Sequence, residues 1–101
     1  MNTPQLGDGA TLRVGSDCYP YTVIEFLNWR GTRILVQADI ADPAPGCDHF
    51  TNQVYTYRRD PNGPTEIYTL RKNGRYHAAG ASMKSSSLSI GARRYYQDPS
   101  F

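Results

Sequence analysis

Glycine and proline interrupt this chain so often that no long helix fits between them. Its 101 residues include nine glycines and seven prolines, and the longest stretch without either is residues 47–60. That stretch carries Thr, Val and Tyr in place of the Ala, Leu, Glu and Lys that favour helices. The sequence therefore predicts an all-β chain of short strands, and its length fits a single domain over residues 1–101.

Seven segments have the β-branched and aromatic composition, or the alternation, of strands. They are residues 10–14, 19–27, 32–39, 53–59, 65–71, 75–78 and 88–90. The stretch 40–52, with two prolines and one glycine, is interpreted as the longest loop. Turns at this spacing favour a small SH3-like barrel, or a meander of six to seven short antiparallel strands.

Two turns carry strong local signals. Asp60-Pro61-Asn62-Gly63 predicts a β-turn in which Gly63 takes the left-handed conformation. Asn73-Gly74 predicts a two-residue hairpin turn. Trp29 falls in a further turn, between residues 28 and 31, where its large ring is expected to cap the end of the barrel.

Charge is distributed unevenly along the chain. Residues 1–50 hold three Arg and six Asp or Glu, which gives −3, whereas residues 51–101 hold eight Lys or Arg and three Asp or Glu, which gives +5. A basic second half is consistent with a phosphate-bearing partner. The alternative is that both halves mix in one barrel, where strands distant in sequence lie side by side and the asymmetry disappears.

Aromatic and basic residues alternate in three places, and six of the eight tyrosines lie in the second half. Tyr rings stack on bases and Arg forks match phosphates, so these clusters are the candidate ligand-binding residues. The alternative is that the rings fill a small barrel and the cations keep hairpin tips soluble. The candidates are Tyr55, Tyr57 and Arg59; Arg71, Lys72, Arg75 and Tyr76; and Arg93, Arg94, Tyr95 and Tyr96.

No motif for catalysis, metal or membrane insertion is present. The two histidines, His49 and His77, accompany no Gly-x-Ser-x-Gly elbow, and Cys18 and Cys47 lack the paired spacing of zinc ligands. We therefore expect a non-enzymatic protein without cofactor or metal. The N-terminus lacks the basic and apolar regions of a signal peptide, which indicates a cytoplasmic protein with reduced thiols.

Several segments, in this order, resemble a family of small uncharacterised proteins that bacteriophages and phage-derived regions of bacterial genomes encode. They are Gly7-Asp8-Gly9-Ala10-Thr11, Tyr21-Thr22-Val23-Ile24-Glu25, Val36-Gln37-Ala38-Asp39, Asp60-Pro61-Asn62-Gly63, Thr69-Leu70-Arg71-Lys72-Asn73-Gly74-Arg75 and Tyr96-Gln97-Asp98-Pro99. The resemblance implies a small accessory phage protein in the cytoplasm of an infected bacterium. Phage proteins of this size often act against host defences.

In that context, the tyrosine and arginine clusters favour a binding protein that sequesters a nucleotide-type immune signalling molecule. A homo-oligomer is expected, because a 101-residue barrel has little room for an internal pocket and an interface can supply one. Two alternatives stay open. One is a small barrel that binds DNA or RNA, against which the net charge of only +2 counts. The other is an inhibitor that docks on a host defence protein through exposed tyrosines and Trp29.

Overall fold

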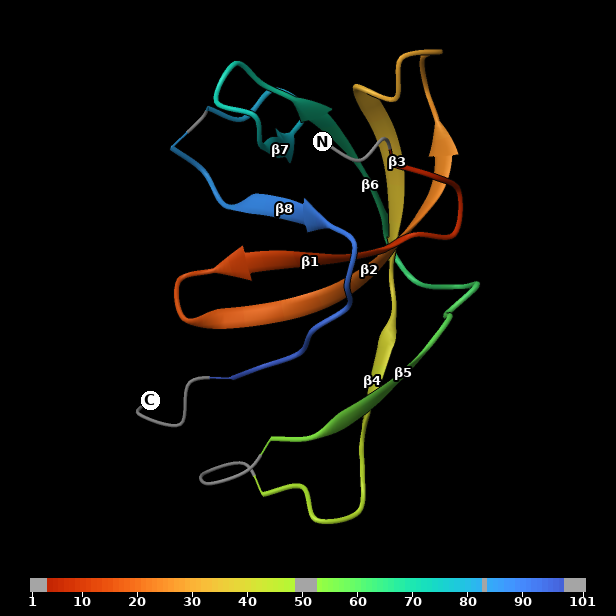
Figure 1. Ribbon diagram of the computed structural model, residues 1–101, viewed down its shortest axis with the longest axis vertical. Helices are drawn as coiled ribbons and strands as arrows, with labels where there is room; N and C mark the ends of the chain where they lie inside the picture. The colour runs from red at the N-terminus through yellow and green to blue at the C-terminus, as the bar shows by residue number, and fades with distance from the viewer. Residues whose placement is uncertain (1–3, 49–52, 83, 98–101) are drawn as a thin grey trace.

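The computed structural model describes residues 4–48, 53–82 and 84–97, and in these residues it is all-β (Figure 1). Each of the seven predicted segments contains a strand, and the predicted antiparallel barrel is confirmed. The strands are β1 (Gly9–Val14), β2 (Asp17–Phe26), β3 (Arg33–Ala38), β4 (Ile40–Pro43), β5 (Tyr55–Arg58), β6 (Thr65–Leu70), β7 (Tyr76–Ala78) and β8 (Ser87–Ile90). The described residues include no helix that could span a membrane.

Six strands close the barrel in the order β1-β2-β3-β6-β7-β8. Closure comes from β8, which pairs β1 from Ala10↔Ile90 to Arg13↔Ser87, so two strands near opposite ends of the chain lie side by side. The long strand β2 pairs with β1 and with β3, and its register with β3 shifts between Val23 and Glu25. Such a bulge increases local bending and twist, which helps a ten-residue strand to curve around so small a core.

The core consists of side chains from all six strands of the barrel. Its buried members are Ala10, Val23, Ile34, Val36, Tyr68, Tyr76 and Leu88. One polar ring, that of His77, is buried with them, at 1% exposed. Its Nε2 lies 3.1 Å from Asn73 Nδ2 and its Nδ1 lies 3.2 Å from Ser85 Oγ, so the ring connects the β6–β7 turn to the loop before β8.

Strands β4 and β5 form a two-stranded arm that projects from the barrel (Figure 1). The interpretation of residues 40–52 as a loop was therefore wrong for Ile40–Pro43. Pro43 ends this strand, and β5, which the sequence predicts, supplies the partner through pairs from Ile40↔Arg58 to Pro43↔Tyr55. Composition hid β4, because proline disfavours strand interiors but is tolerated at an edge or an end.

Both turn predictions need correction in detail. Gly63 is not among the glycines with positive φ, so the left-handed conformation expected there was wrong. Glycine is required there for space, because a Cβ would lie 2.6 Å from the backbone oxygen of Ala38. The β6–β7 turn has three residues between Arg71 and Arg75 instead of two, and Gly74 at φ 79° occupies its left-handed position.

A buried polar network joins β2, the end of β3 and the C-terminal segment. The side chain of Asp39 is 0% exposed and accepts hydrogen bonds from Thr22 Oγ1 at 2.7 and 2.8 Å and from Arg93 Nε at 2.7 Å. Arg93 Nη2 also donates to Thr22 Oγ1 at 2.8 Å. Arg59 Nη1 lies 3.7 Å from Asp39 Oδ1, and its Nη2 donates to Gln37 Oε1 at 3.0 Å.

Ion pairs between the two halves of the chain neutralise part of the charge asymmetry of the sequence. Each ion pair among the described residues joins a cation of the second half to an anion of the first, namely Arg93–Asp39, Arg59–Asp39 and Arg58–Asp42. The mixing of both halves in one barrel is confirmed for these residues.

Buried tyrosines make the fold sensitive to alkaline pH. Burial, followed by the charge of Glu66, raises the pKa of Tyr68 and of Tyr21 above the ordinary value of 10.0, and burial alone raises that of Tyr76. Above about pH 10 the unfolded chain loses these protons while the folded chain retains them, so the free energy of unfolding is expected to fall as pH rises. Urea unfolding between pH 8 and 11 checks this, and Tyr68→Phe is expected to flatten the fall. A free energy of unfolding that stays constant across this range would contradict it.

Candidate functional site

A cavity opens where β7 and β8 separate. These two strands pair only at Tyr76↔Leu88 and His77↔Ser87, whereas β8 follows β1 for four residue pairs. Beyond Leu88 the wall of the barrel is therefore incomplete. The β2–β3 turn and the β6–β7 turn flank the gap, and they lie at the same end of the barrel because Leu70 N donates to Thr32 O at 2.7 Å.

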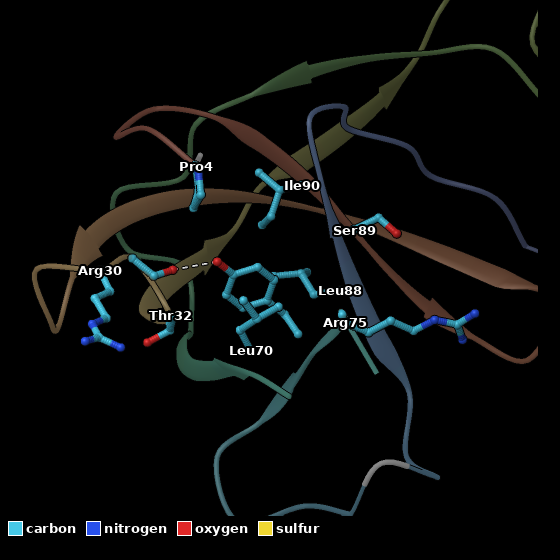
Figure 2. A pocket seen from close by; sticks show the side chains of 11 residues that line it. Pro4, Arg30, Thr32, Leu70, Arg75, Leu88, Ser89 and Ile90 are labelled. Atoms are coloured by element: carbon cyan, nitrogen blue, oxygen red, sulfur yellow. Dashed lines mark hydrogen bonds between the residues drawn. The ribbon is translucent and has the colours of Figure 1, made fainter. Parts of the chain in front are cut away.

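The cavity has a volume of about 540 Å³, with an apolar floor and a polar rim. Its size falls within the roughly 300–1,000 Å³ that is usual for small-molecule sites. Figure 2 shows Leu70, Leu88 and Ile90 near its centre, with the rim residues around them. The lining residues are Pro4, Arg30, Gly31, Thr32, Leu70, Gly74, Arg75, Tyr76, Leu88, Ser89 and Ile90.

Hydrogen bonds fix the parts of the cavity that do not carry charge. The hydroxyl of Tyr76 donates to the backbone oxygen of Gly31, the bond drawn in Figure 2, and so fastens the ring to the β2–β3 turn. Asn28 Oδ1 accepts from the backbone N–H of Thr32 at 3.1 Å, while its Nδ2 donates to Thr32 Oγ1 at 2.7 Å. Since Thr32 Oγ1 accepts this bond, its own O–H proton is left as a donor for a ligand.

Trp29 lies beside this cavity and is 88% exposed, so the prediction that it caps the barrel was wrong. At this end of the barrel the buried ring is that of Tyr76, whose hydroxyl donates to the β2–β3 turn. The guanidinium carbon of Arg30 lies 5.0 Å from the centroid of the Trp29 ring, within cation–π distance. An exposed aromatic face and a cation therefore stand together at the rim.

Most of the cavity lining comes from segments that contain cations and no carboxylates. Segments 26–38 and 67–97 contain no Asp or Glu, and all the lining residues except Pro4 come from them. The cations Arg30, Arg33, Lys72 and Arg75 are exposed in these segments near the two turns. Charges of one sign around a hollow raise the local concentration of oppositely charged ligands, so this end of the barrel favours anions.

In the cluster predicted at residues 71–76, some residues lie at this cavity and Arg71 stabilises the fold instead. Arg75 and Tyr76 line the cavity, and Lys72 is exposed in the neighbouring turn. Arg71 serves the fold, because its guanidinium donates to Ala81 O at 2.7 Å, Ala78 O at 2.9 Å and Thr69 Oγ1 at 2.6 Å.

The other two clusters meet at the base of the arm, away from the cavity. The Tyr95 ring makes edge contacts with Tyr55, at 4.7 Å between centroids, and with Tyr19, at 6.0 Å. Tyr57 Oη accepts from the backbone N–H of Tyr95 at 2.9 Å, and Tyr96 forms an isolated bridge with Cys18. Burial raises the pKa of both Tyr55 and Tyr95. These rings attach the C-terminal segment to the arm and to β2.

The arginines of these clusters differ in what they can offer a ligand. Arg59 and Arg93 are held in the Asp39 network, whereas Arg94 is exposed. The eleven predicted residues therefore do not converge on one site, and a binding role for those at the arm stays a prediction. A second, smaller hollow of about 230 Å³ lies here, lined by Tyr19, Pro20, Tyr21, Ala38, Asp39, Ala41 and Tyr95.

Sequence reasoning missed Arg30, Thr32 and Ser89 as site residues. Trp29 in the same turn was singled out, but without a link to the basic cluster at 71–76. The two turns come together through the pairing of β3 with β6, which places Arg33 opposite Thr69, and this pairing is not visible in the sequence. Ser89 carries no sequence signal. It lines the cavity because the pairing of β7 with β8 stops at Tyr76↔Leu88 and leaves Ser89 without a partner in β7.

The thiols and imidazoles do not form a metal centre among the described residues. Cys18 is buried and Cys47 is partly buried, and both are free cysteines. His49, the second of the two histidines, lies outside the described residues. One chain forms this cavity by itself, so a pocket does not require an interface, and the expected homo-oligomer stays a prediction.

Comparison of the chain with family models, curated proteins and solved structures found no match.

Proposed function

We propose that this protein is a non-enzymatic binding protein that sequesters a nucleotide-type small molecule in the cavity at the end of its barrel. The observation that carries the proposal is a cavity with an apolar floor and a rim of hydroxyl and guanidinium donors, whose described lining contains no carboxylate. A phosphate requires donors and positive charge, and a base or sugar ring requires apolar and aromatic cover. This site offers both.

The aromatic part of a ligand has two surfaces available. Tyr76 forms part of the cavity lining, and Trp29 stands exposed at the rim. Stacking on an aromatic ring does not depend on the identity of the base, which suits capture of a signalling nucleotide. Together with the resemblance to small phage proteins, this supports a counter-defence role in the cytoplasm of an infected bacterium.

Binding without turnover also fits the residues at hand. The described lining residues include no carboxylate, thiol or imidazole, the groups that most often act as general acids, general bases or activated nucleophiles. They present donors that hold an anion in place.

Arg75→Gln tests the proposal, because Arg75 lines the cavity and its exposed side chain forms no ion pair with the described residues. Loss of a charge-assisted bond to phosphate is expected to weaken binding about tenfold or more. Isothermal titration with a panel of mononucleotides and cyclic nucleotides measures it. Lys84→Gln is the matched control, since Lys84 is exposed but outside the cavity. An absence of heat with every nucleotide would reject the proposal, and native mass spectrometry of the same protein gives its oligomeric state.

Trp29 supports a second candidate, an inhibitor that docks on a host defence protein. It is the most exposed of the large hydrophobic side chains described, and tryptophan and arginine are common anchors of protein interfaces. If Trp29→Ala abolishes capture of a defence protein while nucleotide binding is absent, this candidate replaces the first. Binding of DNA or RNA by the same cations would weaken steeply with salt.

A further inference from the structure

The polar groups of the cavity form two sets that come from different parts of the chain. Arg30 and Thr32 belong to the β2–β3 turn, whereas Arg75 belongs to the β6–β7 turn and Ser89 to β8. Figure 2 shows Arg30 and Thr32 on one side of Leu70 and Leu88, with Arg75 and Ser89 on the other. The donors are therefore divided by an apolar strip.

Each set can bind an anion by itself. On one side, Thr32 retains its hydroxyl proton because Asn28 occupies its oxygen, and the guanidinium of Arg30 is two residues away. On the other side, Arg75 and Ser89 are both exposed at the rim. Neither arginine forms an ion pair among the described residues, and the guanidinium of Arg30 contacts only the uncharged ring of Trp29, so both groups keep their charge for a ligand.

We propose that the ligand carries two anionic groups separated by an uncharged body, as a cyclic dinucleotide does. This inference rests on the proposed function and specifies the ligand class of the same cavity. A ligand with one phosphate, or with adjacent phosphates as in GTP, would place its charge on one set and leave the other arginine unused. Two separated phosphates engage both sets, and the part of the ligand between them covers Leu70 and Leu88.

The test compares probes that differ in how their anionic groups are spaced. Calorimetric titrations use cyclic di-GMP, GTP and GMP with the wild-type protein, Arg30→Gln, Arg75→Gln and the double variant, and Lys84→Gln serves as the control. Cyclic di-GMP is expected to bind most tightly and to lose about tenfold in affinity in each single variant and about a hundredfold in the double variant. GMP is expected to bind weakly and to respond to one arginine only.

Equal or tighter binding of GTP or GMP, or a full effect from a single arginine, would overturn the two-anion inference while nucleotide binding stands. A second pair of probes tests whether the cavity binds two separated phosphates that do not belong to a nucleotide. If no nucleotide binds but fructose 1,6-bisphosphate binds more tightly than fructose 6-phosphate and requires both arginines, the two-anion site stands and the nucleotide assignment fails. If neither bisphosphate nor nucleotide binds, both proposals are rejected.

Discussion

Asp39→Ala is expected to lower the free energy of unfolding by about 3 kcal/mol, because it leaves the partly buried Arg93 guanidinium without its anion. The carboxylate is 0% exposed and holds Thr22 and Arg93 by hydrogen bonds of 2.7–2.8 Å. Its loss would leave the Arg93 guanidinium next to Thr22 without a counter-charge, and would also remove the anion that faces Arg59. Urea unfolding followed by circular dichroism measures the difference.

The chain contains a matched control for this variant. Asp42 forms an ion pair with Arg58 at a similar distance, 2.8 Å, but both side chains are largely exposed, at 44% and 62%. Solvent weakens such a pair, so Asp42→Ala is expected to be much less destabilising than Asp39→Ala. Equal losses in the two variants would mean that the Asp39 network contributes no more than a surface pair.

Gly63→Ala is expected to destabilise the fold by about 3 kcal/mol, because the added methyl group has no room. Its Cβ would lie 2.6 Å from the backbone oxygen of Ala38 and 3.2 Å from that of Asp60. Backbone atoms cannot turn aside as the end of a flexible side chain can, so the turn must move. The same turn accepts hydrogen bonds from Gln37 Nε2 at Pro61 O and Gly63 O, which such a shift would disturb.

Asn62→Ala is the control for Gly63→Ala, since Asn62 is exposed in the same turn. Replacing it removes only a side chain at the surface, and the expected change is within about 1 kcal/mol. Thermal and urea unfolding measure the free energy of unfolding of both variants. If Gly63→Ala is as stable as Asn62→Ala, the close approach of the turn to β3 is not a constraint.

The strands could be predicted because their signals are local. Residues 32–39 alternate and residues 60–63 form a strong turn, so β3 and the start of β6 were located within a residue or two. The strand Ile40–Pro43 could not be found in this way, because its pairing with β5 depends on a partner that follows a long connection. The role of Gly63 was also inaccessible, since it depends on how close Ala38 lies in the folded chain.

The site was predicted only in part for the same reason. Arg75 and Tyr76 were found because a basic and aromatic cluster is visible in the sequence, and both line the cavity. The same reasoning selected Arg71, Arg59 and Arg93, which are used within the fold. Sequence alone does not distinguish an arginine that faces a buried carboxylate or a loop carbonyl from one that faces solvent, because that depends on the pairing of distant strands.

The pairing of β1 with β8 has a consequence for how the protein is made. Thr11 meets Ser89 across this seam, so a ribosome must synthesise nearly the whole chain before the first strand obtains its second neighbour. Until then β1 has an open edge, and the apolar face that it shares with β2 has no cover from Leu88. Contacts between such distant residues slow folding, and exposed strand edges invite association between nascent chains. Closure of the barrel is therefore a late step, which waits until β8 has been synthesised.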